Sequence, residues 1–262
     1  MKNRLKQILA QGKPAIGSWI GFSDPYAVEM MADIGFDWLL IDMEHFPMSK
    51  ETLRTVLMAC KGSASVPVVR VPINSRDYTQ AALDLGAQGV MAPMIDSAKD
   101  ALRAVEFCRY PPNGRRGFGP VRASRYLRDM EEYRREANGE IALFVQIETP
   151  EAVQNAPEIF GSAGVDGVFI GNGDLASFMN HGRAGSEEVQ QVVNRLIEMA
   201  RSVSMPTGLP VWSAEECEAY VRRGACLLTV GSDLGFLANG ARADLTNVRR
   251  FLETAKRTTS EP

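Results

Sequence analysis

Short runs of apolar residues recur along the whole chain and alternate with longer amphipathic stretches. These runs lack the alternation of a half-exposed strand, which is typical of parallel strands buried on both faces. We expect eight strands, at 15–20, 36–41, 67–71, 89–94, 141–147, 165–170, 207–212 and 225–230. Repeated βα units of this length predict one (β/α)8 barrel, a single domain over residues 1–262.

The stretches between the strands carry helix start and stop signals. Pro25 and Pro150 each stand where the first turn of a helix tolerates proline. Ser213 with Glu216 three residues later has the form of a capping box. Glycines suited to a left-handed helix cap follow three of the predicted helices, at Gly35, Gly86 and Gly224. A doubly wound open sheet is the alternative fold, but no GxGxxG motif follows the first strand.

One connection, residues 109–140, is too long for a plain βα unit. It is rich in arginine and ends in a charged helix that we expect at about 127–137. One interpretation is a solvated face. The other is a flap or subunit contact that also recruits an anionic substrate. Only the tail, residues 257–262, is predicted to be disordered.

Composition is that of an ordinary folded protein, with 45% hydrophobic and 23% charged residues. The formal net charge of -3 gives no electrostatic reason to expect a nucleic acid or an anionic membrane as partner. The four cysteines form no CxxC motif and are typical of buried residues in a reducing compartment. No signal peptide or run of 18 apolar residues is present, so we expect a cytoplasmic enzyme.

Polar residues gather where the predicted strands end, and in a (β/α)8 barrel this end carries the active site. Strands 1 and 7 end near Trp19 and Trp212, which we expect to contact the substrate. The ends of strands 2, 3, 5 and 6 bring a histidine, an arginine, an amide and several acids to the same rim: Asp42, His45, Arg70, Gln146, Glu148 and Asp174.

Glu148 and Asp174 are the predicted metal ligands. Each follows an apolar strand, where an unpaired carboxylate would be costly to desolvate. Two carboxylates, with water and substrate oxygens completing the coordination, describe a hard divalent site of the Mg²⁺ or Mn²⁺ type. The alternative for each residue alone is a helix cap or a surface acid.

His45 is the natural general base near neutral pH, and the alternative is a hydrogen-bonded loop histidine. The second histidine, His181, is expected to be structural or peripheral. Schiff-base aldolases need a desolvated lysine in the site, but no lysine ends a predicted strand. Polarisation of a carbonyl by a metal is therefore favoured over imine chemistry.

Several ordered segments resemble the HpcH/HpaI aldolase family of class II pyruvate aldolases. The similarity extends from about residue 4 to 250 and rests on Asp42-Met43-Glu44-His45, on 67–72, 83–87, 109–117 and 145–149, and on 167–175.

This resemblance implies an aldolase that reversibly cleaves 4-hydroxy-2-oxo acids to pyruvate and an aldehyde through a metal-bound pyruvate enolate. It implies a divalent ion (Mg, Mn or Co) on Glu148 and Asp174, with His45 as base. It also implies that Arg70 stabilises the oxyanion and that Asp84 pairs with the histidine. Asp42 and Gln146 match positions that support the metal ligands. The family also implies a catabolic homo-oligomer, commonly a hexamer with exchanged C-terminal helices. Asp84 itself lies in the last turn of a helix, where the dipole disfavours an acid, so it calls for a compensating partner on this chain or on another.

The chain departs from the family at Gly171-Asn172-Gly173, where Pro-Ala or Pro-Ser usually follows the first glycine. We expect the backbone amides of this loop to hold the pyruvate carboxylate. Loss of the proline loosens the loop, so this departure bears on the identity of the substrate more than on the class of reaction. Two other functions stay open: a citrate-lyase-like acyl-CoA lyase, and a catalytically silent barrel acting as a binding protein.

Overall fold

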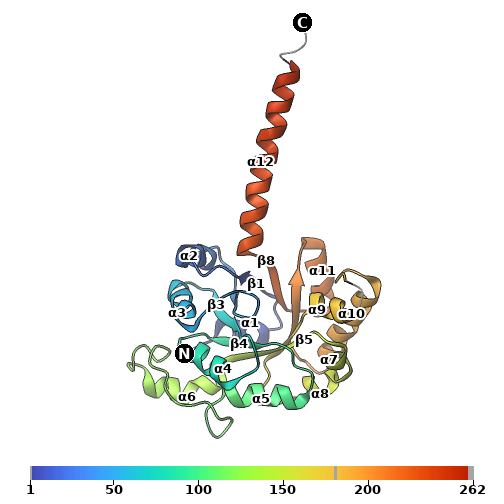
Figure 1. Ribbon diagram of the computed structural model, residues 1–262. Coiled ribbons are helices and arrows are strands. Elements are labelled where there is room, and N and C mark those ends of the chain that lie inside the picture. Colours follow the sequence, from blue (N-terminus) through green and yellow to red (C-terminus); the bar gives the residue numbers. More distant parts are fainter. Residues whose placement is uncertain (1, 180–181, 259–262) are drawn as a thin grey trace.

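Eight parallel strands close into a barrel in the computed structural model, which describes residues 2–179 and 182–258 (Figure 1). The order around the barrel is the order along the chain. The strands are Ala15–Ile20 (β1), Trp38–Asp42 (β2), Val66–Arg70 (β3), Gly89–Ala92 (β4), Ala142–Ile147 (β5), Gly167–Ile170 (β6), Thr207–Val211 (β7) and Leu227–Ser232 (β8). His181 and residues 259–262 of the predicted tail lie outside the described residues, whereas the start of that tail, residues 257–258, is helical and not disordered as predicted.

Each predicted strand overlaps an observed one, and the predicted (β/α)8 barrel is confirmed. Parallel pairing of β1 with β8 closes the sheet, so the open-sheet alternative is wrong. The boundaries shift by up to two residues. β2, for example, begins at Trp38 instead of at residue 36.

Helices surround the barrel and begin as their capping residues predict. Asp24 accepts hydrogen bonds from the amides at the start of α2, Thr149 caps α7, and Ser213 caps α11. The helices are Arg4–Ala10 (α1), Pro25–Asp33 (α2), Lys50–Ala59 (α3), Arg76–Asp84 (α4), Ala98–Cys108 (α5), Met130–Glu140 (α6), Pro150–Gln154 (α7), Ala156–Phe160 (α8), Asn172–Phe178 (α9), Glu187–Ser202 (α10), Ala214–Arg223 (α11) and Asp233–Thr258 (α12).

Two apolar clusters make up the core. The larger one fills the space between the strands and the surrounding helices. The smaller one fills the barrel interior, where Trp38 packs with Phe144 and Phe169. Leu5 and Leu9 of α1 belong to this inner cluster. Because α1 and the inner cluster fill the barrel from the side of α1, the open mouth is the other one, at the carboxyl ends of the strands. In this fold that mouth carries the active site.

The long connection between α5 and β5 consists of residues 109–129 and helix α6. The predicted helix start near 127 is too early because Arg125, Tyr126 and Leu127 have φ of 54°, 58° and 70°, which a right-handed helix excludes. The two ends of the connection are joined: the Tyr110 amide donates to Asn138 Oδ1 at 2.7 Å, and Asn138 Nδ2 donates to the Tyr110 carbonyl at 3.0 Å.

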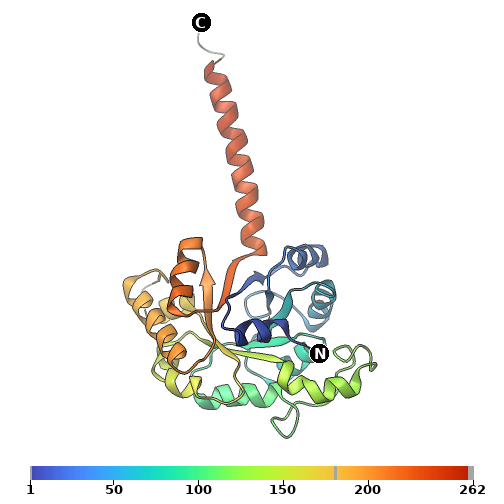
Figure 2. The same cartoon turned by 180° about the vertical axis from the view of Figure 1, so that it is seen from behind.

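The last helix, α12, extends away from the barrel in both views (Figures 1 and 2). Only its beginning packs on the barrel, where Phe236 stacks on Phe36. The rest carries exposed large apolar side chains, namely Leu237, Leu245, Val248, Phe251 and Leu252. Exchange of this helix between subunits stays a prediction. None of the described helices combines the length and hydropathy needed to cross a bilayer.

Candidate active site

The predicted polar rim lies at the carboxyl ends of β2, β3, β5 and β6. Asp42 and Arg70 are the last residues of neighbouring strands and are paired in register. Glu148 directly follows β5, and Asp174 lies in the first turn of α9, just after β6. Parallel strands deliver their ends to one edge, so side chains far apart in sequence converge here.

Arg70 is the central cation of this rim and its side chain is only 5% exposed. Nε and Nη2 donate to the two oxygens of Asp42 at 3.0 and 2.7 Å, a bidentate pair. Nη1 lies 3.1 Å from Glu44 Oε2, and the guanidinium stacks 4.4 Å from the ring of Trp19. These contacts fix the plane and the direction of the guanidinium.

Glu148 is a buried carboxylate, 2% exposed, and makes no ion pair with an arginine or lysine among the described residues. Oε1 accepts a 2.7 Å hydrogen bond from the Met94 amide, and Oε2 accepts one from Gln146 Nε2. Burial raises the pKa of Glu148 to about 7, and the charges of Glu44 and Asp174 add to the rise. The protein thus holds a carboxylate whose charge is poorly compensated by its own side chains.

Glu44 is a functional candidate that sequence reasoning did not single out. Its Oε2 is buried and accepts no hydrogen bond within the described structure. Burial raises the pKa of Glu44, while Arg70 and His45 oppose that rise, and the charges of Asp42 and Asp174 add to it. Its place in the Asp42-Met43-Glu44-His45 motif, at the end of β2, was the available signal.

His45 lies on the loop after β2 with a side chain that is 57% exposed, and its Nε2 is 3.9 Å from Glu44 Oε2. Asp42 Oδ1 orders this loop by accepting from the amides of Glu44 and His45. The alternative of a packed, hydrogen-bonded histidine does not fit this exposure. An exposed imidazole beside a carboxylate can exchange protons with a ligand and with solvent.

The two predicted tryptophans differ. Trp19 lies against Arg70 and donates from Nε1 to Thr229 at 2.8 Å, so it supports the arginine. Trp212 is 69% exposed at the end of β7. Its side chain is available at the rim, while its amide is bound by Glu216.

The Gly171-Asn172-Gly173 segment is the start of helix α9, not a loop. The Gly171 amide is not available to a carboxylate, because it donates to the carbonyl of Ile147 at 2.9 Å. A Cβ at position 171 would lie 2.7 Å from Glu148 Oε2, so only glycine fits here. The amides of Asn172 and Gly173 belong to the first turn, where helix amides lack intrahelical partners and favour anions.

Asp84 lies in α4, and its partner is on the same chain. Arg116, completely buried, donates to Asp84 Oδ1 at 2.7 Å and to the hydroxyl of Tyr133 at 3.2 Å. A partner on another chain is therefore not needed to compensate this acid. No hydrogen bond or ion pair joins Asp84 to His45 within the described chain.

The model of the HpcH/HpaI aldolase/citrate lyase family matches residues 15–240. The chain belongs to this family. Membership confirms the resemblance found in the sequence and the expected enzyme class, a lyase of the aldolase type.

Individual family members are similar over nearly the whole chain. The 4-hydroxy-2-oxo-heptane-1,7-dioate aldolase of Klebsiella pneumoniae is 40% identical over 262 residues, 99% of this chain and 97% of that protein. A family protein from Burkholderia cenocepacia has a crystal structure with a TM-score of 0.89 and 32% identity, covering 95% of this chain and 100% of its own. The HpcH/HpaI aldolase of Desulfitobacterium hafniense has a TM-score of 0.88 and 27% identity, covering 94% and 96%.

The donor set of this family member suits a hard divalent cation. Within residues 2–179 and 182–258, no group of three or more His, Cys, Asp or Glu side chains is arranged to hold a metal ion. Glu148 and Asp174 remain, together with two buried oxygens that accept no hydrogen bond: Gln146 Oε1, and Glu44 Oε2, which is ion-paired with Arg70. An excess of oxygen acceptors around Glu148 fits a cation with bound water better than it fits an empty apolar pocket.

Proposed function

We propose that this chain is a divalent-metal-dependent aldolase that reversibly cleaves 4-hydroxy-2-oxo acids to pyruvate and an aldehyde. The observation that carries the proposal is Glu148: a buried carboxylate facing other acids, beside an arginine fixed at the end of the neighbouring strands. The name of the Klebsiella relative supports a dicarboxylic substrate of this class.

Glu148 and Asp174 would hold the metal, with Gln146 fixing the orientation of Glu148 through its amide. When bound, a Mg²⁺, Mn²⁺ or Co²⁺ ion supplies Lewis-acid polarisation of the 2-oxo group. Asn172 and Gly173, at the amino end of α9, would favour the carboxylate of the substrate through their amides.

Arg70 stabilises the negative charge that develops on the 2-oxo oxygen as the C3–C4 bond breaks. Asp42 holds the guanidinium in plane, so the group does not reorganise during the reaction. His45 takes the proton of the 4-hydroxyl, directly or through water, and its exposure lets the proton pass on to solvent. Trp212 would contact the aldehyde part of the substrate at the rim.

The test is release of pyruvate from a 4-hydroxy-2-oxo dicarboxylate by the purified protein with added Mn²⁺. The matched reaction contains EDTA. Metal-dependent release supports the proposal, and a protein that is folded and metal-loaded but inactive on every 4-hydroxy-2-oxo acid supplied contradicts it.

A citrate-lyase-like acyl-CoA lyase is the second candidate, since the family includes both classes. The acyl-CoA lyases usually carry Glu-Asp where this chain has Glu44-His45, and the histidine favours the aldolase. Cleavage of a 3-hydroxyacyl-CoA without pyruvate release would favour the lyase. Inactivity in both assays would favour a silent binding barrel.

We further propose that the protein is a cytoplasmic, catabolic homo-oligomer larger than a dimer, a hexamer. The exposed apolar side chains of α12 support this, because a long amphipathic helix without a packing partner is unfavourable in water. Light scattering tests it: an active monomer of 28.7 kDa at working concentration contradicts it.

A further inference from the structure

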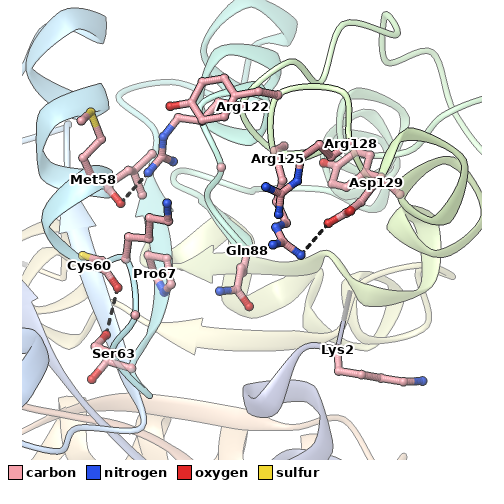
Figure 3. Close-up of a pocket in the computed structure, with 18 of the residues that line it drawn as sticks. Lys2, Met58, Cys60, Ser63, Pro67, Gln88, Arg122, Arg125, Arg128 and Asp129 are labelled. Atoms are coloured by element: carbon pink, nitrogen blue, oxygen red, sulfur yellow. Dashed lines mark hydrogen bonds and ion pairs between the residues drawn. The ribbon is translucent and has the colours of Figure 1, made fainter.

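A cavity of about 640 Å³ lies at the end of the barrel opposite the candidate active site (Figure 3). Its walls are the last turn of α3 with the loop that follows, the starts of β3 and β4, and the irregular residues of the long connection. This volume falls in the range of small-molecule sites, roughly 300–1,000 Å³. None of the residues given a catalytic role above lines it.

The lining of this cavity is strongly basic. Its acidic members are Asp129 and Glu132 alone, against five basic side chains: Lys2, Lys61, Arg122, Arg125 and Arg128. The whole chain, by contrast, has a net charge of -3. Concentration of positive charge in one hollow of an acidic protein raises the local concentration of anions there.

Arg122 is held in place by the barrel itself. Its Nη2 donates to the carbonyl of Leu57 at 3.0 Å, and its Nη1 donates to the carbonyl of Leu85. These carbonyls lie near the carboxyl ends of α3 and α4, where cations are favoured. Gly86 makes room for the guanidinium, since a Cβ there would lie 2.4 Å from Nη1. The charge is therefore positioned in advance of any ligand.

Two further cations come from two different walls of the cavity. Lys61 follows α3, and Arg128 belongs to the long connection; both are exposed. Neither has a carboxylate within ion-pair distance in the described part of the chain, whereas Arg125 pairs with Asp129 at 3.0 Å. Figure 3 shows Arg122, Arg125 and Arg128 around the same hollow, with the Gln88 amide between them.

We propose that this cavity binds a small-molecule anion with at least two negative charges, carried by phosphate or carboxylate groups. The anion bridges Lys61 on the barrel to Arg128 on the long connection, with Arg122 beside them. Ligand binding therefore fastens the irregular residues 121–129 to the barrel.

The proposal is tested by calorimetric titration of the intact protein in buffer without divalent ions. One titration uses tripolyphosphate and the other uses propane-1,2,3-tricarboxylate, so the pair distinguishes phosphate from carboxylate as the source of charge. Lys61→Glu and Arg128→Glu should each weaken binding at least about tenfold, as expected for the loss of one charge-assisted contact. Arg195→Glu is the matched control, because Arg195 is exposed on α10 and does not line the cavity. It should bind as the unchanged protein does.

Hydrogen exchange supplies a second readout that is independent of affinity. The amides of residues 121–129 should exchange more slowly with the anion present. Two results of the titrations overturn the proposal: no binding of either anion at about 10 mM, or equal binding by Arg128→Glu and Arg195→Glu. A third result also overturns it: the protein binds neither anion, and Lys61→Glu and Arg128→Glu dissociate the oligomer. The cavity would then be a contact between subunits.

Discussion

The two ends of the barrel gather charge of opposite sign. At the carboxyl ends of the strands, one buried guanidinium faces four carboxylates, those of Asp42, Glu44, Glu148 and Asp174. At the opposite end, five basic side chains outnumber two acids around an open hollow. The charges at the first end therefore favour binding of a cation, and those at the second end favour binding of an anion. Because the first end is desolvated, substitutions there should have the larger effects.

The largest effect is expected from removing the predicted metal ligands. Glu148→Gln, Asp174→Asn or EDTA should each lower aldol cleavage by at least about a thousandfold, because carbonyl polarisation is lost. Mg²⁺, Mn²⁺ or Co²⁺ should restore the chelated protein but not the two variants. Arg195→Glu should keep full activity. Pyruvate release is the measurement, and undiminished cleavage in EDTA would refute the metal site.

Arg70→Ala should reduce cleavage about a hundred- to a thousandfold, the usual cost of a lost oxyanion donor. Arg70→Lys should rescue only in part, since an ammonium lacks the planar fork that Asp42 binds. The alanine variant also leaves Asp42 buried and unpaired, so the free energy of unfolding should fall by about 3–5 kcal/mol.

The double variant Arg70→Ala/Asp42→Asn separates these roles. It should regain part of the stability in urea unfolding while staying inactive. Recovery of activity along with stability would mean that Arg70 acts only by supporting the fold.

His45→Ala should lose aldol cleavage by roughly a hundred- to ten-thousandfold, because no group takes the hydroxyl proton. Decarboxylation of oxaloacetate forms the same enolate without removing a hydroxyl proton, so it should be largely retained. The two rates are measured in one preparation, with Arg70→Ala as the variant that loses both. Equal loss of both rates in His45→Ala is the outcome that excludes a base role.

Metal affinity should depend on pH through Glu148. Its pKa is raised from 4.5 to about 7, so the folded protein keeps a proton between these values that the unfolded chain has released. The metal-free protein should accordingly lose stability as pH rises from about 4.5 to 7. Mn²⁺ needs the carboxylate, so its affinity should fall up to about tenfold per unit below pH 7. Calorimetry checks this, and a flat profile between pH 5.5 and 7 would contradict it.

The smallest effect is expected at Met94, whose φ of 52° directs its amide toward Glu148. Met94→Gly adopts this conformation freely and should change the free energy of unfolding by about 1 kcal/mol or less, with unchanged Mn²⁺ affinity. Met94→Val should weaken Mn²⁺ binding, because a β-branched residue avoids left-handed backbone. Equal affinities in the two variants would show that the amide does not orient the carboxylate.

The barrel could be predicted because the strands are largely apolar runs, most of whose positions are buried, and because capping residues mark many of the helix starts. The rim followed, since Arg70, Glu148 and Asp174 stand at or just beyond strand ends. Glu44 was missed because no hydrophobic periodicity in the sequence distinguishes it from any other acid in a loop. The burial of its Oε2 atom is visible only in three dimensions.

Other features depend on contacts between distant segments. The Gly171 amide donates to the carbonyl of Ile147, and Asp84 pairs with Arg116, which is 32 residues further along the chain. Neither partner has a sequence spacing that indicates it. Residues 125–127 have left-handed backbone conformations, but they include no glycine or asparagine from which this could have been predicted.

The joined ends of the long connection have an evolutionary consequence. The side chain of Asn138 binds both the amide and the carbonyl of Tyr110, and Arg109 donates to the Ile141 carbonyl at the entry to β5. The segment therefore leaves and rejoins the barrel at one fixed point. Within the segment, Arg116 binds Asp84, and Arg122 binds the carbonyls of Leu57 and Leu85. Residues between these anchors can change without altering strand register, so the connection can diversify around its anchors while the catalytic scaffold is inherited intact.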